Sequence, residues 1–381
     1  MKGRYESISI AGETVRAFVP DALPPKLFLS DDLRNLDLRA AAALSRLQLA
    51  GEMVPSVEWF LYGFVRKEAV ITSQIEGTQA TLLDLLEFEA SEGVADADVE
   101  EVTNYISALH WSRKQLSDPK GVPLSVRLLN GAHQRLMRGV RGQNKHPGHV
   151  RKSQNWIGGT RPGNARFVPP PAHLLPDLLS DLEKYIHESG PLPPLVRAGF
   201  VHVQFETIHP YLDGNGRIGR LLATLLLEHW ELLPQPLLYL SLYFKRHRAE
   251  YYERLNAVRQ QGDWLGWTRY FLEGVETIAN EATETARALF TLFAKDRERV
   301  LAHAAATVSA ARLFERLPVH PIVTVAKVTT LLSITKPTAM KAIDVLAAAG
   351  ILSETSARKR DRVFGYQAYL RILAAGTELE R

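Results

Sequence analysis

The stretch His209-Pro-Tyr-Leu-Asp-Gly-Asn-Gly-Arg-Ile-Gly-Arg220 combines a histidine, a carboxylate and two arginines around a glycine-rich turn. Small residues let a backbone approach a ligand closely, and the first amides of a helix form a nest for an anion. Arg217 and Arg220 lie three residues apart on the first turn of the helix that we expect to follow. Two cations are unfavourable there unless an anion lies between them. The stretch therefore predicts a phosphate site.

Two further groups of the stretch suit phosphate chemistry. Asp213 is a natural magnesium ligand, because magnesium at such sites takes one or two carboxylates together with substrate phosphates. His209 can act as a general base at neutral pH, since an imidazole titrates near that range. The stretch thus predicts a phosphate site that also carries a metal ligand and a base.

Three other interpretations of the stretch are weaker. The spacing Gly214-x-Gly216-x-x-Gly219 matches a dinucleotide fingerprint, which needs a preceding apolar strand and an acid about 20 residues on. Polar residues interrupt 201–208, and the later position falls in Pro234-Gln-Pro. A zinc site on His209 and Asp213 lacks a third ligand at helical spacing. The stretch could also be an ordinary capped helix start whose charged side chains contact only water. That interpretation does not explain why a histidine, an aspartate and two arginines occur together at this spacing.

Length and composition set the outer limits. The chain has 381 residues, 46% of them hydrophobic and 23% charged, with a net charge of +4, so we expect a folded protein of two or three domains. It has no cysteine, which excludes disulfides, thiolate catalysis and cysteine-ligated metals. The N-terminus has no signal-peptide pattern, and no stretch approaches the roughly 20 apolar residues of a membrane span. We therefore expect a cytoplasmic protein without membrane contact.

Periodicity predicts a mainly α-helical chain. After an extended opening to Pro25, helices are expected over 31–49, 55–76, 81–89, 100–115, 123–136, 173–188, 195–208, 217–230, 245–261 and 264–298. The segment 145–171, rich in Gly, Pro and Asn, predicts a β-hairpin with an exposed tip. At the C-terminus, helices over 324–332 and 337–349 and strands over 351–355 and 363–368, with basic residues at 358–362, follow a winged-helix pattern.

His209–Arg220 resembles the motif of the Fic family, histidine–x–Phe–x–Asp/Glu–Gly–Asn–Gly–Arg–x–x–Arg, with Tyr211 where the family usually has Phe. We expect Tyr211 to be buried and its hydroxyl to find a partner. The likeness covers roughly residues 30–280. Asn155-Trp-Ile-Gly-Gly and Phe167-Val-Pro-Pro-Pro resemble the flap hairpin of the family, and Tyr251-Tyr-Glu-Arg-Leu resembles the helix that closes its nucleotide pocket.

The resemblance implies a protein adenylyltransferase, which moves AMP from ATP onto a Ser, Thr or Tyr hydroxyl of a target protein. His209 would be the catalytic base and Asp213 the Mg²⁺ ligand. The nucleotide would be held by Gly214, Asn215, Gly216, Arg217, Ile218, Gly219, Arg220, Tyr251 and Tyr252. The target would pair with the flap at Trp156, Ile157, Gly158 and Gly159 through main-chain hydrogen bonds.

Thr72-Ser-Gln-Ile-Glu76-Gly77 resembles the inhibitory motif of the same family. Independently of the resemblance, Gly77 places Glu76 in the last turn of its helix, where the dipole disfavours a carboxylate by roughly 0.3–1 kcal/mol. A nearby cation would offset this cost, and the resemblance supplies Arg220. A carboxylate on Arg220 would take the place of the γ-phosphate, so the inhibition would act within one chain.

These observations predict a mainly α protein in three segments. They are an N-terminal helical region with the inhibitory motif (residues 1–100), a Fic helical core with a β-hairpin flap (101–298) and a winged-helix domain (299–381). Two other activities stay open: removal of AMP from a modified protein, with Glu76 aligning a water, and a DNA-binding regulator that senses ATP through an inactive core. Self-modification, a homodimer and nucleic-acid binding are also open, although helix 337–349 has few groups suited to base edges.

Overall fold

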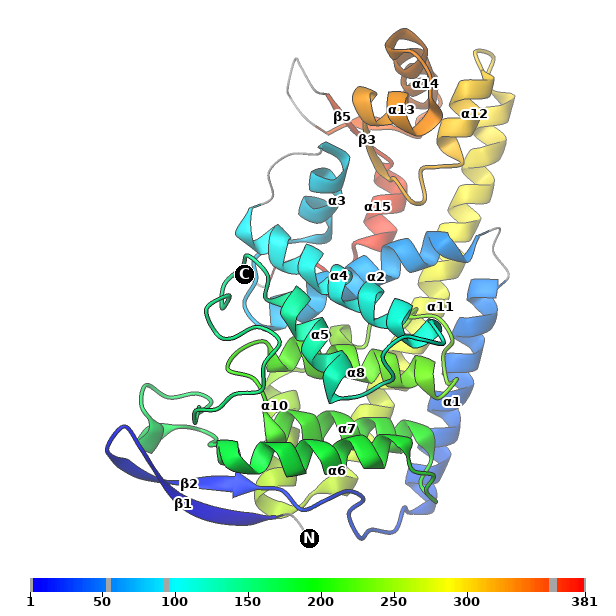
Figure 1. Cartoon of the computed structure of the whole chain (residues 1–381). Coiled ribbons are helices and arrows are strands. Elements are labelled where there is room, and N and C mark those ends of the chain that lie inside the picture. The colour runs from blue at the N-terminus through cyan, green and yellow to red at the C-terminus, as the bar shows by residue number, and fades with distance from the viewer. Residues whose placement is uncertain (1–2, 53–55, 92–95, 356–361, 380–381) are drawn as a thin grey trace. The chain divides into compact units, whose positions relative to one another are not determined.

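The computed structural model describes residues 3–52, 56–91, 96–355 and 362–379, and the chain divides into two compact units. The first unit holds residues 1–45, 104–236 and 240–279, and the second holds 46–103, 237–239 and 280–381. Helices α1 (Asp31–Glu52), α4 (Ala97–Ser117) and α11 (Trp264–Ala302) contribute residues to both units (Figure 1). The described elements are mostly helices, which confirms the predicted class.

The first unit joins one β-hairpin to a set of packed helices. Strands β1 (Arg4–Ile10) and β2 (Glu13–Val19) pair antiparallel, with Arg4 opposite Val19. The helices of this unit are α5 (Val126–Leu136), η1 (Pro162–Asn164), η2 (Ala172–Leu174), α6 (Leu175–His187), α7 (Pro194–Ile208), α8 (Asn215–His229), α9 (Ser241–Arg246) and α10 (Arg248–Gln261). Figure 1 shows α6 and α7 lying side by side in this unit.

Helix α7 is the centre of the first unit. Every residue from Leu195 to Ile208 is buried, and a helix that is buried all round has neighbours on every side. Its neighbours include α6, α8 and α10. Most of α8 is buried as well. The loop that joins α7 to α8 is therefore held at both ends by a buried helix.

The second unit combines two helices of the N-terminal half with the C-terminal elements. These elements are α2 (Val57–Ile75), α3 (Leu82–Ser91), α12 (Val308–Phe314), β3 (Ile322–Thr324), α13 (Val325–Leu332), α14 (Lys336–Ala348), β4 (Ser353–Glu354), β5 (Val363–Gly365) and α15 (Gln367–Leu373). The three strands form an antiparallel sheet in the order β3-β5-β4. Helices α13 and α14 are joined by a short turn at Ser333, which has a left-handed φ of 54°.

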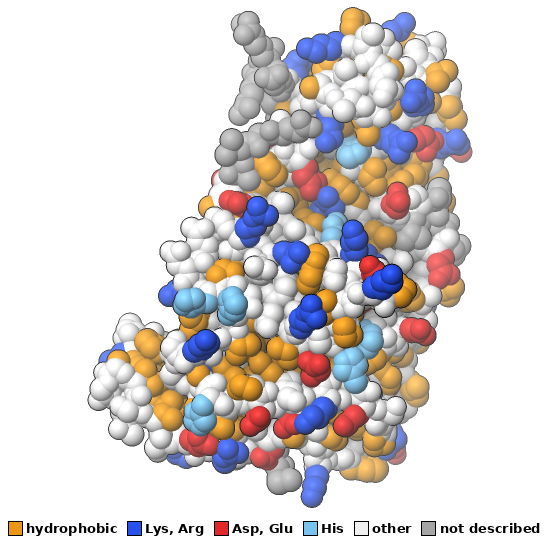
Figure 2. Space-filling model, in the orientation of Figure 1, with side chains coloured by type: hydrophobic (Ala, Val, Ile, Leu, Met, Phe, Trp, Pro, Cys, Tyr) orange, Lys and Arg blue, Asp and Glu red, His pale blue; other side chains and the backbone are white. Residues whose placement is uncertain are grey.

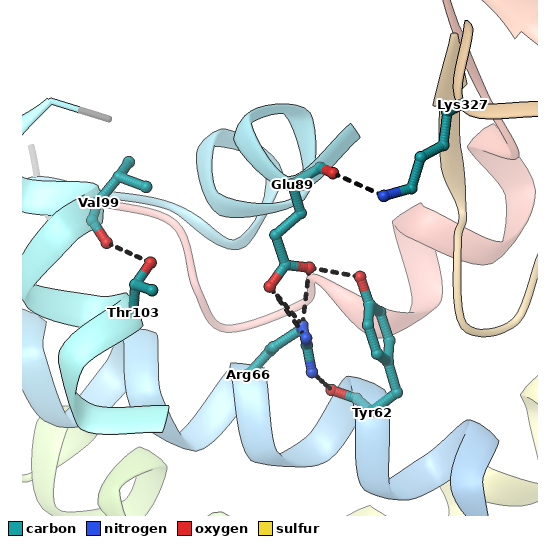
Figure 3. A network of polar contacts seen from close by, with 6 residues as sticks. All are labelled: Tyr62, Arg66, Glu89, Val99, Thr103 and Lys327. Carbon is teal, nitrogen blue, oxygen red and sulfur yellow. Dashed lines mark hydrogen bonds and ion pairs between the residues drawn. The ribbon is translucent and has the colours of Figure 1, made fainter. Parts of the chain in front are cut away.

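A polar network ties the second unit together around Glu89 of α3 (Figure 3). Its carboxylate accepts hydrogen bonds from the Tyr62 hydroxyl at 2.5 Å and from Arg66 Nε at 2.9 Å, both on α2. Its backbone carbonyl accepts from Lys327 Nζ on α13 at 3.4 Å. The Arg66 guanidinium also lies 3.5 Å from the centre of the Tyr62 ring. One acidic residue thus links helices that are far apart in the sequence.

Some predicted elements differ in the structure. The single helix predicted over 245–261 is broken at His247, whose Nδ1 lies 3.0 Å from the Tyr243 carbonyl. The strand predicted over 363–368 ends at Gly365, because helix α15 begins at Gln367. Helix α12 and strand β3 were not predicted. The predicted wing residues Arg358, Lys359 and Arg360 lie outside the described residues, and the winged-helix assignment stays a prediction.

The face formed by α5 and α6 carries an apolar groove of about 550 Å³. Figure 2 shows hydrophobic side chains gathered on this face. The apolar lining of the groove is Val126, Val150, Pro176 and Leu179, and its polar lining is Ser180, Glu183, Lys184 and His187. Among the described residues, none of the helices combines the length and the apolarity that crossing a bilayer requires.

Candidate functional site

The loop between α7 and α8 starts and ends in left-handed backbone. His209 has a φ of 50°, and its N–H donates to Phe205 O at 2.9 Å, which closes the last turn of α7. Gly214 has a φ of 77° and directly precedes α8. A residue with a side chain adopts such a conformation only where its surroundings hold it there, and these residues cluster at functional sites. The buried helices on both sides hold His209.

Asn215 clamps this loop from inside. Its side-chain oxygen accepts the Tyr211 N–H at 2.8 Å, and its side-chain amide donates to the Tyr211 carbonyl at 2.8 Å. Asn215 is only 2% exposed, so both bonds are shielded from water. The sequence predicts that Asn215 contacts a phosphate. In the structure, its side chain is used to hold the loop. Any contact of Asn215 with phosphate is left to the backbone amide at the start of α8.

Tyr211 is buried, and its hydroxyl donates to Asn130 Oδ1 at 2.9 Å. This confirms the expectation for the residue that departs from the family motif. Its ring stacks on the imidazole of His133, with the centroids 3.9 Å apart and the planes 6° from parallel. The hydroxyl that Tyr211 adds to the family motif therefore forms a hydrogen bond to α5.

His133 of α5 supports the other end of the loop. Its Nδ1 accepts the Gly148 N–H at 2.8 Å, so the neutral ring carries its proton on Nε2, which lies 3.0 Å from the Asp213 carbonyl. Burial lowers the pKa of His133 to about 4, which keeps the ring neutral at physiological pH. The sequence analysis missed this residue, because a histidine inside an amphipathic helix gives no signal of its own.

The Asp213 carboxylate suits a magnesium ion. Oδ1 accepts the Gly214 N–H at 2.6 Å, and the side chain is 40% exposed. Beside Oδ2 stands Gly142, where a Cβ would come within 2.6 Å of that oxygen, so the missing side chain keeps the approach open. Among the described residues no group of three or more His, Cys, Asp or Glu could hold a metal. One carboxylate completed by substrate phosphates and water is an arrangement that magnesium accepts.

Arg217 and Arg220 are both buried in the first turns of α8, at 1% and 3% exposure. Arg217 Nη2 lies 4.0 Å from Asp213 Oδ1, the limit for an ion pair, and 3.8 Å from Met137 Sδ. Two buried guanidinium groups near the positive end of a helix dipole repel each other and the dipole. An anion bound at this helix start would relieve both repulsions.

The small residues of α8 allow close helix packing. A Cβ on Gly219 would lie 2.4 Å from Glu206 Oε1 of α7, and the Gly219 carbonyl lies 3.0 Å from His202 Nδ1. Gly216 and Ile218 complete the first turn, with Ile218 fully buried. Gly219 therefore serves helix packing, while Gly214 and Gly216 lie at the start of the helix.

Arg151 is a second residue that the sequence analysis missed. It is 3% exposed, and its guanidinium donates to three backbone carbonyls: His209 at 3.0 Å, Ser153 at 3.1 Å and Pro170 at 2.6 Å. Its own N–H donates to Pro210 O at 2.9 Å. Arg151 therefore ties the loop of His209 to both arms of the segment 151–171. The sequence signal was one arginine in a Gly- and Pro-rich stretch, too common to single out.

Replacing Arg151 with methionine should lower the free energy of unfolding by about 3 kcal/mol, because the buried carbonyl of Pro170 and the partly buried bonds to His209 and Ser153 would lose a charged donor. Urea denaturation of the full chain measures this change. Arg161→Met is the matched control, since Arg161 lies in the same segment on the surface and pairs with Glu13. An Arg151 variant as stable as the control would contradict the role given to these bonds.

The segment that we call the flap segment, residues 155–168, is less regular than a two-stranded hairpin. A single antiparallel bridge joins Ile157 to Phe167, with the Ile157 N–H donating to Phe167 O at 2.8 Å. Gly158 and Gly159 turn the chain with φ values of 68° and 75°, and Trp156 is 37% exposed. Docking of a target at these residues stays a prediction.

The two tyrosines assigned to the nucleoside have different surroundings. Tyr251 is 1% exposed, stacks on Phe244 at 4.6 Å and places its hydroxyl 2.8 Å from His202 Nε2. Tyr252 is 40% exposed, with its ring centroid 5.2 Å from that of Tyr251. The nucleoside contact stays a prediction for both residues, of which Tyr252 is the more exposed.

We expect the chain to lose stability as the pH falls from about 6.5 to 4, partly through His202. Burial lowers the pKa of His202 to about 4, so the unfolded chain binds a proton there at a higher pH than the folded chain does. The contribution is fully present above pH 6.5 and amounts to about 3 kcal/mol when lost. Denaturant titrations of the wild type and of His202→Gln should differ in their pH slope over this window. Equal slopes would contradict the assignment.

The residues that the sequence assigns to an inhibitory motif lie in the second unit. Helix α2 ends at Ile75, Glu76 follows at φ −88° and ψ 2°, and Gly77 reverses the chain at φ 96°. Thr72 is fully buried. After the turn, the Thr78 hydroxyl donates to Glu101 Oε2 at 2.8 Å. The helix end that Gly77 predicted is therefore present, and the pairing of Glu76 with Arg220 stays a prediction.

Parts of the chain match known families and known proteins. Residues 35–114 match the Fic/DOC family N-terminal pattern and residues 123–227 match the Fic/DOC family pattern. A probable protein adenylyltransferase of Aquifex aeolicus is 28% identical over 171 residues, which cover 45% of this chain and 50% of that protein. Protein adenylyltransferase fic-1 of Caenorhabditis elegans is 30% identical over 125 residues, covering 32% of this chain and 22% of that protein. The chain thus spans half or less of the length of these relatives.

Solved structures share the fold. A Fic family protein from Desulfovibrio desulfuricans G20 superposes with a TM-score of 0.59 at 21% identity, covering 90% of this chain and 98% of that chain. A Fic domain containing signaling protein from Bacteroides thetaiotaomicron gives a TM-score of 0.53 at 18% identity, covering 65% and 97%.

Proposed function

We propose, from the Fic/DOC N-terminal and Fic/DOC domains that this chain contains, that it is a protein adenylyltransferase. It would transfer AMP from ATP to a Ser, Thr or Tyr hydroxyl of a target protein. The observation that carries the proposal is the loop from His209 to Gly214, which the side chains of Asn215 and Arg151 hold between two buried helices.

In the proposed reaction, the start of α8 binds the phosphates of ATP. Backbone amides of its first turn and the buried groups of Arg217 and Arg220 offset the phosphate charge. His209 takes the proton of the target hydroxyl as that oxygen attacks the α-phosphorus. The new bond joins the hydroxyl oxygen to phosphorus, the bond between the α-phosphorus and the bridging oxygen breaks, and pyrophosphate leaves.

Asp213 would hold Mg²⁺ together with oxygens of the substrate phosphates. The bound ion would supply charge neutralisation at the phosphates. Two backbone groups give this carboxylate its position: the Gly214 N–H binds Oδ1, and the Asp213 carbonyl lies against His133. These contacts would therefore hold the Asp213 carboxylate, as one oxygen ligand of the metal, beside the backbone amides that bind the phosphates.

Glu76 would inhibit the transfer by pairing with Arg220 in place of the γ-phosphate. The support is local: Glu76 stands at the C-terminal end of α2, where the helix dipole disfavours its charge. Arg220 lies in the first turns of α8. ATP would then bind with its α-phosphate turned away from His209.

Incubation with labelled ATP, magnesium and a cell extract tests the proposed function. Label at the α-phosphate should appear on protein, whereas label at the γ-phosphate should leave as pyrophosphate. Protein labelled only from the γ-position would indicate a kinase and overturn the proposal. Release of AMP from a protein already modified would favour the alternative in which Glu76 aligns a water for hydrolysis.

A further inference from the structure

A second polar pocket lies in the first unit, outside the anion nest. It encloses about 300 Å³ between the β1–β2 hairpin, the flap segment and α10. Of its lining residues three are arginines, Arg16, Arg166 and Arg259, and none is an aspartate or a glutamate. The transfer reaction proposed above uses none of these arginines. The pocket therefore has a positive lining without an assigned ligand.

The arginines of the hairpin and the flap segment fall into two classes. Arg4 pairs with Glu6 at 2.9 Å, and Arg161 pairs with Glu13. Arg16 and Arg166, the two that line the pocket, are exposed and form no ion pair with any residue that the structure describes. Arg4 and Arg161, outside the pocket, are thus neutralised by ion pairs with glutamates. The charges of Arg16 and Arg166, inside the pocket, remain for a ligand to neutralise.

Arg259 forms the floor of the pocket. It is 6% exposed, lies over the Phe167 ring at 4.0 Å and donates to the Thr207 hydroxyl at 3.2 Å and to Glu206 O at 3.1 Å. Burial lowers the pKa of Arg259 to about 10, so it stays charged at neutral pH. The negative charge of Glu206 acts in the opposite direction and raises the pKa of Arg259. Because Thr207 and Glu206 precede His209 by two and three residues, the pocket adjoins the catalytic loop.

The two outer walls of the pocket, the β1–β2 hairpin and the flap segment, are held together before any ligand binds. The Phe18 N–H of β2 donates to Val168 O of the flap segment at 3.0 Å, which fixes the hairpin against the flap. Val15 and Ala17 pack with Val168 in one apolar cluster. The Arg16 guanidinium stands over the Tyr5 ring at 4.5 Å. A ligand would therefore bind without a large cost of ordering the walls.

We propose that this pocket is a specificity subsite that takes the carboxylate of an Asp or Glu side chain on the target protein. The inference rests on the proposed function, because the target must dock beside the flap for its side chain to enter. Two arginines offer forked donors, which match a carboxylate in bidentate geometry. The phosphates of ATP already have Arg217 and Arg220, so the target supplies the second anion.

Synthetic acceptor peptides test the subsite. Each carries one Tyr, Thr and Ser near its centre, and a single Glu is scanned over six positions on either side, with Gln at the same position as the reference. Labelling from α-labelled ATP by Glu76→Gly enzyme should be about tenfold higher for Glu than for Gln at one position. Combined Arg16→Ala and Arg166→Ala should reduce this ratio to near one, whereas Arg4→Ala and Arg161→Ala should keep it. Combined Arg16→Glu and Arg166→Glu should favour Lys at that position.

Two further measurements separate the possible failures. ATP affinity, measured by calorimetry, should not change in the double alanine variant, and a clear loss would assign the pocket to the nucleotide and overturn the inference. Peptides labelled without a preference for Glu would also overturn it while leaving the proposed function intact. If no peptide is labelled, fluorescence anisotropy still compares binding of the Glu and Gln peptides without catalysis. Equal binding would then overturn the subsite independently of the transfer activity.

Discussion

Replacing His209 with alanine should lower AMP transfer at least ~10²-fold while leaving ATP binding nearly unchanged. The imidazole would touch only the attacking hydroxyl, and loss of a general base typically has this scale. Affinity for ATP should come from the anion nest and from the buried arginines of α8. Incorporation of α-label and calorimetric titration with ATP measure the two quantities on the same protein.

A second variant at His209 is needed because the backbone there is left-handed. His209 has a φ of 50°, which alanine adopts with strain and asparagine tolerates better. His209→Asn should therefore keep the loop conformation and still lose the transfer. Full activity in either variant would contradict the role of His209 as the base. Loss of ATP binding in the alanine variant alone would indicate a disturbed loop.

Replacing Glu76 with glycine should raise α-label incorporation at least about tenfold, both on the chain itself and on targets. Arg220 can pair well with Glu76 or with the γ-phosphate, but not with both, and a charged hydrogen-bonded pair is worth about 1.5–3 kcal/mol. Combining Glu76→Gly with Arg220→Ala should remove the gain, because the γ-phosphate contact is lost. Unchanged labelling in a folded Glu76→Gly protein would show that the inhibitory assignment is wrong.

Two controls refine this experiment. Glu76→Gln keeps the side-chain volume and helix propensity but removes the charge, so it should activate as glycine does if the carboxylate itself inhibits. Activation by glycine alone would indicate loosening of the end of α2 instead. Measuring removal of AMP on one modified target tests the hydrolytic alternative, which expects Glu76→Gly to lose removal as it gains addition.

The sequence drew attention to the loop between α7 and α8 but not to the residues that hold it. The stretch from His209 to Arg220 stood out because it groups a histidine, a carboxylate and two arginines around a glycine-rich turn. The start of α8 was predicted at Arg217 and lies at Asn215, since a helix that begins with Asn-Gly has weak intrinsic helix propensity. Gly77 predicted the end of α2 correctly because a helix often ends with glycine in the left-handed region.

Residues that act through long-range contacts were not predictable. His133 and Arg151 contact the loop between α7 and α8 from positions 80 and 58 residues away, and no local pattern marks such contacts. Helix α15 was missed for another reason. Only Tyr366 separates its sequence QAYLRIL from the strand Val363–Gly365, and a short apolar run does not distinguish the end of a strand from the start of a helix.

The hydrogen bonds of Arg151 bear on how the proposed specificity for a target could change over time. Its three side-chain bonds all end on main-chain carbonyls, and every residue type supplies a carbonyl. Substitutions at Ser153 or along the tip of the flap segment therefore leave the placement of His209 intact. In the proposed function, target recognition could thus vary while the chemistry is retained, and new targets would be acquired through exposed side chains.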